Sequence, residues 1–225
     1  MDRIKEFLER AGIKYNDLNK YEEPFLHSSY TNETPWDDVS YDRLEFFGDS
    51  ILGFYTTEHL FNIFPNYNEG EMTLIKNRIV NKEALSKIGR ELEIQNLMFL
   101  GQGEDKNNLS DSIFEDVIES LIGAIYLDAG DIEARKFVLN YILKDIELLT
   151  VEDAKDSKSK LQELIQADNR KSVFYKTDNG IRLKDGKLSF TAKAIFEGTT
   201  IGKGKGLSKK EAEKAAAKDA IDRMA

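Results

Sequence analysis

Two apolar segments of the chain each carry a pair of carboxylates, and this placement restricts the fold more than any other feature. Glu45 and Asp49 are four residues apart, and Asp116 and Glu119 are three apart. Each pair therefore shares one face if its segment is a helix. Because grouped carboxylates repel one another and are costly to desolvate, two such pairs among core-like residues favour a bound cation. The alternative is a solvated face on each helix.

The available ligand types narrow the choice of cation. Oxygen-only ligation favours Mg²⁺, with Mn²⁺ as a substitute, and Mg²⁺ in turn favours phosphate substrates. The chain has no cysteine and only His27 and His59, which excludes zinc–thiolate sites, disulfides and thiol nucleophiles and disfavours a Ser-His-Asp triad. The lack of cysteine, the charged start and the absence of a membrane-length apolar run predict a cytoplasmic protein without a membrane span.

The net charge of −9 conceals two oppositely charged parts. Residues 157–225 contain 16 basic and nine acidic residues, which gives a net charge of +7. Residues 1–156 contain the remaining 16 basic and 32 acidic residues, which gives a net charge of −16. The basic part is a candidate for binding a polyanion, and the acidic part would then need metal ions to approach it. Ordinary variation of charge between domains is the alternative.

The hydrophobic pattern divides the chain near residue 150. Apolar residues recur at three- and four-residue spacing in the first part, which predicts an all-helical domain over residues 1–150 with helices at 4–11, 44–60, 74–88, 117–127 and 134–149. Gly48 and Gly123 lack side chains and would let two of these helices pack closely beside the carboxylates. The polar segment 151–156 is predicted to be a linker to a smaller domain over residues 157–225.

The smaller domain is predicted to be α+β, with the order α-β-β-β-α. A helical pattern over 158–166 precedes alternating β-branched and aromatic residues over 172–176, 187–196 and 199–203, and a helix over 208–224 closes the chain. Glu197-Gly198 is typical of a tight hairpin turn. The Ala215-Ala-Ala217 run would let the last helix lie close to a sheet.

The start of the last helix is a candidate phosphate site. Ser208 followed three residues later by Glu211 is a capping-box pattern, so the helix should begin there. Lys209 and Lys210 then lie on the first turn and Lys214 one turn beyond Lys210. Lysines at a helix start oppose the helix dipole, and an anionic partner resolves that conflict.

Several stretches also resemble the motifs of the ribonuclease III family, and they occur in the family's order. Asp42-Arg-Leu-Glu-Phe-Phe-Gly-Asp-Ser-Ile-Leu52 looks like its signature. The further matching stretches are His27-Ser-Ser-Tyr30, Glu69-Gly-Glu-Met-Thr73, Val80-Asn-Lys-Glu-Ala84, Gly101-Gln-Gly-Glu104 and Glu115-Asp-Val-Ile-Glu-Ser-Leu-Ile-Gly-Ala-Ile-Tyr-Leu-Asp128. Together the matches cover essentially the whole chain.

The resemblance implies an all-helical endonuclease domain that forms a homodimer and cuts double-stranded RNA with Mg²⁺. The products would carry 5′-phosphate and 3′-hydroxyl ends with short 3′ overhangs, and the role would be processing of rRNA and mRNA precursors. By position, the residues are assigned as follows: Glu45, Asp49, Asp116 and Glu119 as the metal-binding catalytic set, Asp42 and Glu69 as further acidic residues of the catalytic valley, and Phe46 as a dimer contact. The alternative for Phe46 is an ordinary core phenylalanine.

Two positions depart from the family pattern. Asp42 stands where the family usually has the longer glutamate, and Glu115 stands where a small residue is common. We expect Glu115 to be a solvated charge. His27 is expected to brace the fold through a hydrogen bond rather than to act as a general base.

The second part resembles the double-stranded RNA-binding domain, which reads A-form geometry through phosphates and 2′-hydroxyls. By position, the predicted RNA contacts are Gln162, Glu163 and Gln166 on the first helix, Arg182 and Lys184 between the first strands, and Ser208, Lys209, Lys210 and Lys214 at the last helix. The Leu183-Lys-Asp-Gly186 stretch lacks the Gly-Pro-x-His loop frequent in that family, so we expect weaker or less shape-selective binding.

Two alternatives to an RNA-cutting enzyme remain open. A catalytically inactive RNA-binding regulator or ribosome-associated protein would have the same fold but usually lacks members of the carboxylate set. A metal phosphohydrolase of small molecules would need histidine ligands that the sequence does not offer, and it would leave the basic part unexplained.

Overall fold

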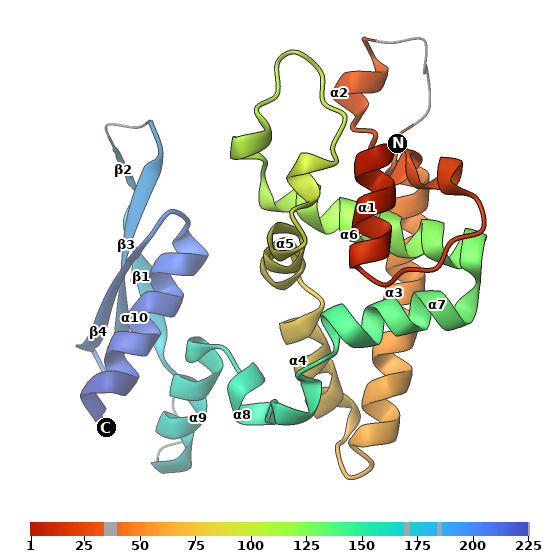
Figure 1. Cartoon of the computed structure of the whole chain (residues 1–225). Helices are drawn as coiled ribbons and strands as arrows, with labels where there is room; N and C mark the ends of the chain where they lie inside the picture. The colour runs from red at the N-terminus through yellow and green to blue at the C-terminus, as the bar shows by residue number, and fades with distance from the viewer. Residues whose placement is uncertain (34–39, 169–171, 184–185, 225) are drawn as a thin grey trace. The chain divides into compact units, whose positions relative to one another are not determined.

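The computed structural model describes residues 1–33, 40–168, 172–183 and 186–224 (Figure 1). The chain forms two compact units, Met1–Thr150 and Val151–Ala225. The first is helical and the second combines helices with an antiparallel sheet, which confirms the predicted fold class. Within the described residues, no helix is both long enough and apolar enough to cross a membrane.

The first unit is built from α-helices joined by short helical turns. The α-helices are α1 (Asp2–Arg10), α2 (Ser28–Thr31), α3 (Asp42–Ile63), α4 (Glu69–Ile79), α5 (Lys82–Glu91), α6 (Asp111–Ala129) and α7 (Asp131–Phe137). The shorter turns are η1 (Leu18–Tyr21), η2 (Glu23–Phe25), η3 (Ile94–Asn96), η4 (Lys106–Asn108), the π-helical η5 (Val138–Ile142) and η6 (Ile146–Leu148).

Two predicted helices are interrupted. The segment predicted as one helix over 74–88 is α4 and α5, because Asn81 ends the first and starts the second. The Asn81 side chain donates to the carbonyls of Asn77 and Arg78 and accepts from the backbone N–H of Ala84. The segment 134–149 likewise passes from α7 into the turns η5 and η6. The three- and four-residue spacing of apolar residues continues across these breaks, so the sequence pattern does not reveal where a helix ends.

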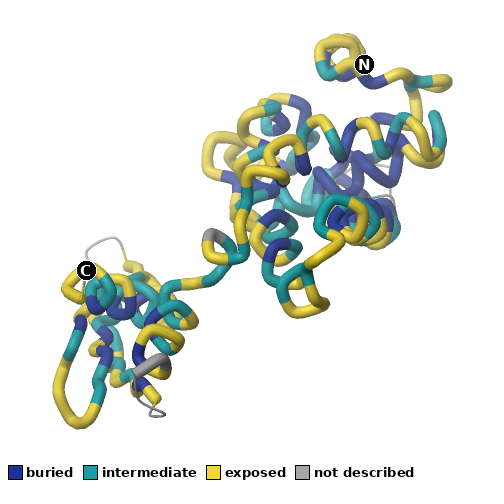
Figure 2. The backbone as a smooth tube through the Cα atoms, turned by 90° about the horizontal axis from the view of Figure 1, so that it is seen from below, coloured by how far each residue is buried: buried dark blue, intermediate teal, exposed yellow. Residues whose placement is uncertain are grey.

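The centre of the first unit is the crossing of α3 and α6. Helix α6 is buried on most of its sides, whereas α3 buries one face and leaves residues such as Phe46 and Phe54 exposed; buried stretches of the backbone are dark blue in Figure 2. The buried residues are Leu44, Ile51, Leu52, Tyr55 and Leu60 of α3 and Val117, Ile118, Leu121, Ile122 and Ile125 of α6. Removing this much apolar surface from water fixes the two helices against each other.

The second unit is a sheet covered on one face by helices. Its elements are α8 (Val151–Ala154), α9 (Ser157–Asp168), β1 (Phe174–Thr177), β2 (Ile181–Arg182), β3 (Leu188–Phe196), β4 (Thr199–Gly206) and α10 (Lys209–Met224). Strand β3 pairs antiparallel with β1, β2 and β4. The β3–β4 hairpin turns at Glu197 and Gly198, both with positive φ, as predicted for a tight turn.

The short strand β2 was not predicted. Both β1 and β2 pair with β3, so together they form one strand with an interruption. The Asp178 carboxylate causes the break, because it accepts the backbone N–H groups of Gly180 and Thr191 in place of the regular ladder. The predicted order of helix, three strands and helix is otherwise preserved, with the first strand in two pieces.

Helix α10 lies along one face of the sheet (Figure 1). Gly202, Gly204 and Gly206 of β4 face this helix so closely that a Cβ at Gly204 would lie 2.2 Å from the backbone nitrogen of Ala216. The core on this side contains buried Ala212, Ala216, Ala217 and Ala220. Small residues on both surfaces thus allow the close packing predicted from the alanine run.

Candidate active site

Two glycines bring the four carboxylates together. A Cβ on Gly48 would lie 1.8 Å from the carbonyl oxygen of Glu119, and one on Gly123 would lie 2.7 Å from the carbonyl oxygen of Leu44. The backbones of α3 and α6 are therefore in contact where Glu45 and Asp49 meet Asp116 and Glu119. The buried Ser120 hydroxyl joins the helices by donating to the carbonyl of Tyr41 at 3.0 Å.

The carboxylates at this crossing destabilise one another's charge. Glu119 is only 8% exposed. Burial, together with the charges of Asp49, Glu115, Glu45 and Asp116, raises its pKa to about 8. At neutral pH the Glu119 side chain therefore holds a proton unless a cation replaces it.

The pKa values of Glu45 and Asp116 are raised as well. Burial first, and then the charges of Asp116 and Asp42, raise the pKa of Glu45. Burial first, and then Glu115, raise the pKa of Asp116, against which Lys82 acts in the lowering direction. The charge of Asp116 acts on both Glu45 and Glu119, and the charge of Glu45 acts on Glu119, so these carboxylates form one electrostatic cluster.

The two outer acidic residues have different positions. The charge of Asp42 acts on both Glu45 and Asp116, so Asp42 lies at the edge of the cluster despite its short side chain. Glu69 is exposed at the first turn of α4, where it accepts a hydrogen bond from Thr73. A helix of α3's length separates its two ends by about 30 Å. The assignment of Glu69 to the catalytic valley therefore stays a prediction.

Glu115 is not the freely solvated charge that we expected. Its carboxylate pairs with Lys82 of α5 at 3.4 Å, and its side chain is 23% exposed. Its charge also raises the pKa values of Asp116, Glu119 and Glu45. Sequence reasoning missed Lys82 as a member of the site, although the Val80-Asn-Lys-Glu-Ala84 stretch contains it.

The bracing hydrogen bond predicted for His27 is present. Its Nδ1 accepts from the backbone N–H of Ser29 and caps α2, and it lies 2.7 Å from the Ser29 hydroxyl. The Ser29 hydroxyl in turn accepts the backbone N–H of Gly101 at 3.0 Å. His27 thus connects the segment before α3 to the loop that begins at Gly101.

The donor set fits a hard divalent cation in kind. It consists of carboxylate oxygens only, and the pKa values of Glu119 and Asp116 are raised first by burial and then by the negative charge of neighbouring carboxylates. Among the described residues, no three acidic or histidine side chains are grouped closely enough to hold a metal ion as they stand. A cation would therefore have to draw these side chains closer together.

Phe46 is 79% exposed, so the alternative that it is a core phenylalanine is wrong. Phe54 and Phe61 of the same helix are also exposed, and their spacing of eight and seven residues puts all three on one side of α3. A hollow beside Phe46 is lined by Leu44, Phe47 and Leu127. The first unit therefore carries an apolar surface strip adjoining the carboxylate cluster.

In the second unit, the predicted contacts of α9 have partners within the chain. The Gln162 side chain accepts the backbone N–H of Val173 at 3.0 Å, and Glu163 pairs with Lys155 at 2.6 Å. Gln166 is exposed. Gln162 therefore fixes the start of the sheet, and any RNA contact by these residues stays a prediction.

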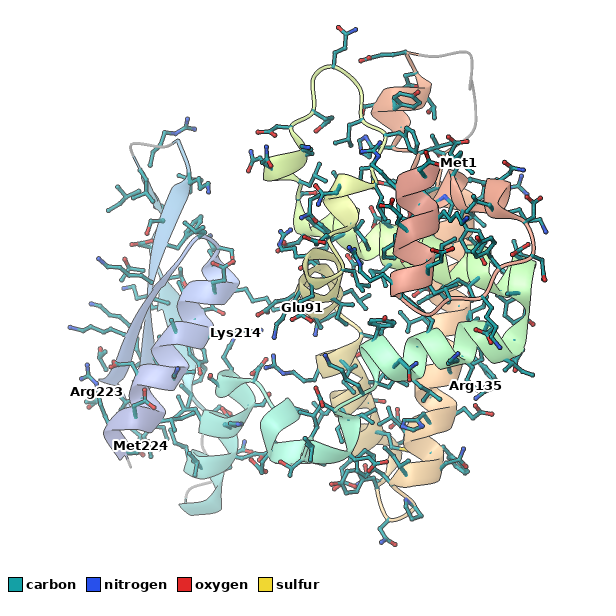
Figure 3. The ribbon with its side chains drawn as sticks, viewed as in Figure 1. Met1, Glu91, Arg135, Lys214, Arg223 and Met224 are labelled. Carbon is teal, nitrogen blue, oxygen red and sulfur yellow. The ribbon has the colours of Figure 1, made fainter. Side chains whose placement is uncertain are left out.

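The other predicted RNA contacts lie at the start of α10 and in the β2–β3 region. The Ser208 hydroxyl accepts the backbone N–H of Glu211, and the Glu211 carboxylate accepts that of Leu207, so the helix begins where the capping pattern predicted. Lys209 and Lys210 are exposed on the first turn. Lys214 is labelled in Figure 3 one turn further along α10. Arg182 is exposed, and Lys184 lies outside the described residues.

Comparisons with known proteins agree with both units. Residues 19–146 match the family described as ribonuclease-III-like, and residues 157–224 match the double-stranded RNA binding motif. Curated relatives named Ribonuclease 3 include one from Borreliella afzelii, 38% identical over 99% of this chain and 91% of the relative. Another, from Mesoplasma florum, is 37% identical over 98% of this chain and 97% of the relative. The chain belongs to the ribonuclease III family of double-stranded RNA endoribonucleases.

A solved structure supports the fold of the first unit. The crystal structure of the nuclease domain of ribonuclease III from Campylobacter jejuni is 28% identical, with a TM-score of 0.58, and the match covers 64% of this chain and 97% of that domain. A second structure of the same domain is described as showing flexibility in a region involved in dimer formation.

Proposed function

We propose that the chain hydrolyses phosphodiester bonds of double-stranded RNA with Mg²⁺, using the carboxylate cluster at the α3–α6 crossing. The observation that carries the proposal is the raised pKa of Glu119, to about 8, among four further carboxylates. A cluster with this much uncompensated charge costs stability and serves no packing purpose. Its presence is explained by a cation and by the phosphate that the cation brings.

Glu45, Asp49, Asp116 and Glu119 would hold the cation, with Mn²⁺ as a substitute for Mg²⁺. When bound, a divalent cation supplies an activated water and neutralises charge on the phosphate. The protein's own part is to fix the carboxylates on two rigid helices and to release the proton held by Glu119. The expected products carry 5′-phosphate and 3′-hydroxyl ends with short 3′ overhangs, consistent with processing of rRNA and mRNA precursors.

The second unit would hold the duplex. Exposed Lys209 and Lys210 lie at the positive end of α10, where backbone N–H groups and the helix dipole favour phosphate. The match to the double-stranded RNA binding motif supports the same interface. Basic charge here would offset the repulsion between a polyanion and the acidic first unit.

We also propose that two copies associate through the apolar strip of Phe46, Phe54 and Phe61. Exposed aromatic residues on one helix face are typical of a protein interface. A Phe46→Ser variant should sediment as a smaller species than the parent chain, whereas an unchanged sedimentation coefficient would argue against this strip.

The test of the activity compares the parent chain with Glu119→Ala on long duplex RNA in Mg²⁺ and in Ca²⁺. Cleavage is expected only for the parent in Mg²⁺, and the variant should lose at least 100-fold in rate while retaining duplex binding. Full cleavage by the variant would remove Glu119 from the mechanism. Binding without cleavage by the parent in Mg²⁺ and in Mn²⁺ would instead favour the inactive RNA-binding regulator.

A further inference from the structure

The sheet of the second unit has a lysine row on the face opposite its helices. The register pairs Lys176 of β1 with Lys193 of β3, and Lys193 with Lys203 of β4. Side chains alternate between the two faces of a strand, and the neighbours of Lys193, namely Ala192 and Ala194, are buried in the core. The three lysines, all of them exposed, therefore project from the other, solvent face.

This row is unfavourable for the sheet by itself. Neighbouring strands lie about 4.8 Å apart, and like charges directly opposite each other destabilise a sheet. Lys205 adds a fourth lysine to the same face, two residues beyond Lys203. No side-chain ion pair is formed by any of these lysines within the part of the chain that the structure describes.

The lysines on the helix side contrast with this row. Lys158 pairs with Glu213 at 2.8 Å, and Lys155 contacts both Glu152 and Glu163. Lys203 lies on the edge strand β4, and its backbone N–H, not its side chain, donates to the Asp219 carboxylate at 2.8 Å. Among the described residues, neither Lys176 nor Lys193 forms an ion pair with an acidic side chain. Folding therefore leaves a concentrated positive charge that internal contacts do not use.

An exposed aromatic residue lies beside the row. Phe174 is 69% exposed, precedes Lys176 by two residues and pairs across the ladder with Ile195 on the same face. A duplex hides the faces of its bases by stacking, whereas a single strand offers them to aromatic side chains. An aromatic platform next to a line of cations is the combination that single-stranded nucleic acid binds.

We propose that the solvent face of β1, β3 and β4 is a second RNA-binding surface that takes single-stranded RNA. Lys176, Lys193 and Lys203 would bind successive phosphates, and Phe174 would stack on a base. This surface is separate from the duplex contacts expected at α9 and the start of α10, which lie on the helix side of the sheet. The inference rests on the proposed function in that the ligand is RNA, such as an unpaired segment flanking a duplex.

The experiment uses the full chain without divalent cations and measures binding of a labelled oligouridine and of a labelled RNA duplex against salt concentration. Lys176→Gln combined with Lys193→Gln should reduce the salt slope of oligouridine binding by about 1.4, because each phosphate contact contributes about 0.7. Phe174→Ala should weaken oligouridine binding about fivefold or more. Neither variant should change duplex binding by as much as it changes oligouridine binding.

A matched control removes the same charge elsewhere. Lys218→Gln combined with Arg223→Gln removes two charges from α10, the helix that packs on the opposite face of the sheet. In this control the salt dependence of oligouridine binding should stay steeper than in the Lys176→Gln and Lys193→Gln double variant. Thermal melting checks folding, and relief of like-charge repulsion should keep the sheet variant at or above the parent's melting temperature.

Three results would overturn the inference. These are an unchanged oligouridine slope in the sheet variant, an equal loss in the helix-side control, or an equal loss of duplex and oligouridine binding. An unchanged oligouridine slope would favour an acidic protein surface, rather than RNA, as the ligand of the lysine row. Each of these results leaves duplex cleavage by the parent chain intact, so it is distinguishable from failure of the proposed function, in which the parent neither binds nor cuts duplex RNA.

Discussion

The middle and the C-terminal end of α6 each carry a buried carboxylate, and the pKa values of the two are shifted in opposite directions. Glu119, at the crossing with α3, and Asp128, near the end of the helix, are each 8% exposed. The pKa of Glu119 is raised to about 8 by burial and by surrounding carboxylates. Burial also acts to raise the pKa of Asp128, but the backbone N–H groups of Asn16 and Asp17 and the ammonium of Lys20 outweigh it and hold the pKa below its usual range.

The difference shows that burial alone does not mark a functional carboxylate. The Asp128 carboxylate accepts the backbone N–H of Asn16 at 2.7 Å and lies 3.3 Å from the Lys20 ammonium. Its charge therefore links α6 to the segment that contains Asn16 and Lys20. Glu119 faces other acids and gains comparable partners only from a ligand. Asp128 at the end of the helix is therefore structural, whereas Glu119 in the middle of the helix is prepared for a cation.

The largest effect should follow from separating the helices at the crossing. Gly48→Ala places a Cβ 1.8 Å from the Glu119 carbonyl oxygen, so the helices must move apart, and we expect a loss of about 3 kcal/mol in unfolding free energy. Gly53→Ala on the same helix is the control, because the nearest atom to its Cβ is the Lys76 ammonium at 3.7 Å. That variant should be neutral or up to about 1 kcal/mol more stable in urea unfolding. Equal stability of the two variants would mean that the close crossing is absent.

The next effect concerns the two carboxylates themselves. Asp128→Asn should lower the unfolding free energy by about 2–3 kcal/mol at pH 8, because charge-assisted hydrogen bonds are lost. Glu119→Gln should raise it by on the order of 2–4 kcal/mol at the same pH without divalent cations. A raised pKa means that the folded state binds more protons, so the parent's stability should fall as pH rises from about 4.5 to 8.

The same urea experiment at several pH values checks the sign. The Asp128 contribution is present above the usual aspartate range and is lost as pH falls through its lowered pKa. Glu119→Gln should flatten the fall between pH 4.5 and 8, and Asp128→Asn should not. A parent chain whose stability is constant over that interval would contradict the unfavourable charge assigned to Glu119.

The smallest effect should come from Lys82. Its pair with Glu115 is largely exposed on the lysine side, at 56%, so Lys82→Gln should change the unfolding free energy by less than about 0.5 kcal/mol. Lys82 also acts to lower the pKa of Asp116, so the variant should raise that pKa further. Carboxyl chemical shifts of Asp116 against pH would show the upward displacement, and a downward displacement would contradict the assignment.

Much of the fold could be predicted because its determinants are local. The cap at Ser208, the hairpin at Glu197 and Gly198 and the glycines at the crossing each depend on residue type and spacing that the sequence shows directly. The carboxylate cluster also followed from spacing, since helical faces are set by a fixed period. The family motifs gave these positions their proposed roles.

The rest depends on partners far apart in the chain. The pairing of Glu115 with Lys82, and the hydrogen bond from Val173 to Gln162, exist only after elements are packed. The exposure of Phe46 likewise could not be read from α3, because this helix carries apolar residues on both its buried and its exposed face. The lysine row across β1, β3 and β4 required the strand register, which the sequence pattern does not give.

The measurement that tests the account most directly is proton release when Mg²⁺ binds. Calorimetric titration of the RNA-free chain at pH 7, in two buffers of different ionisation enthalpy, counts the protons displaced. Because Glu119 should be mostly protonated there, we expect close to one proton released per Mg²⁺ bound and weaker binding by Glu119→Gln. Mg²⁺ binding without proton release, and with equal affinity in the variant, would contradict a cation site at the α3–α6 crossing.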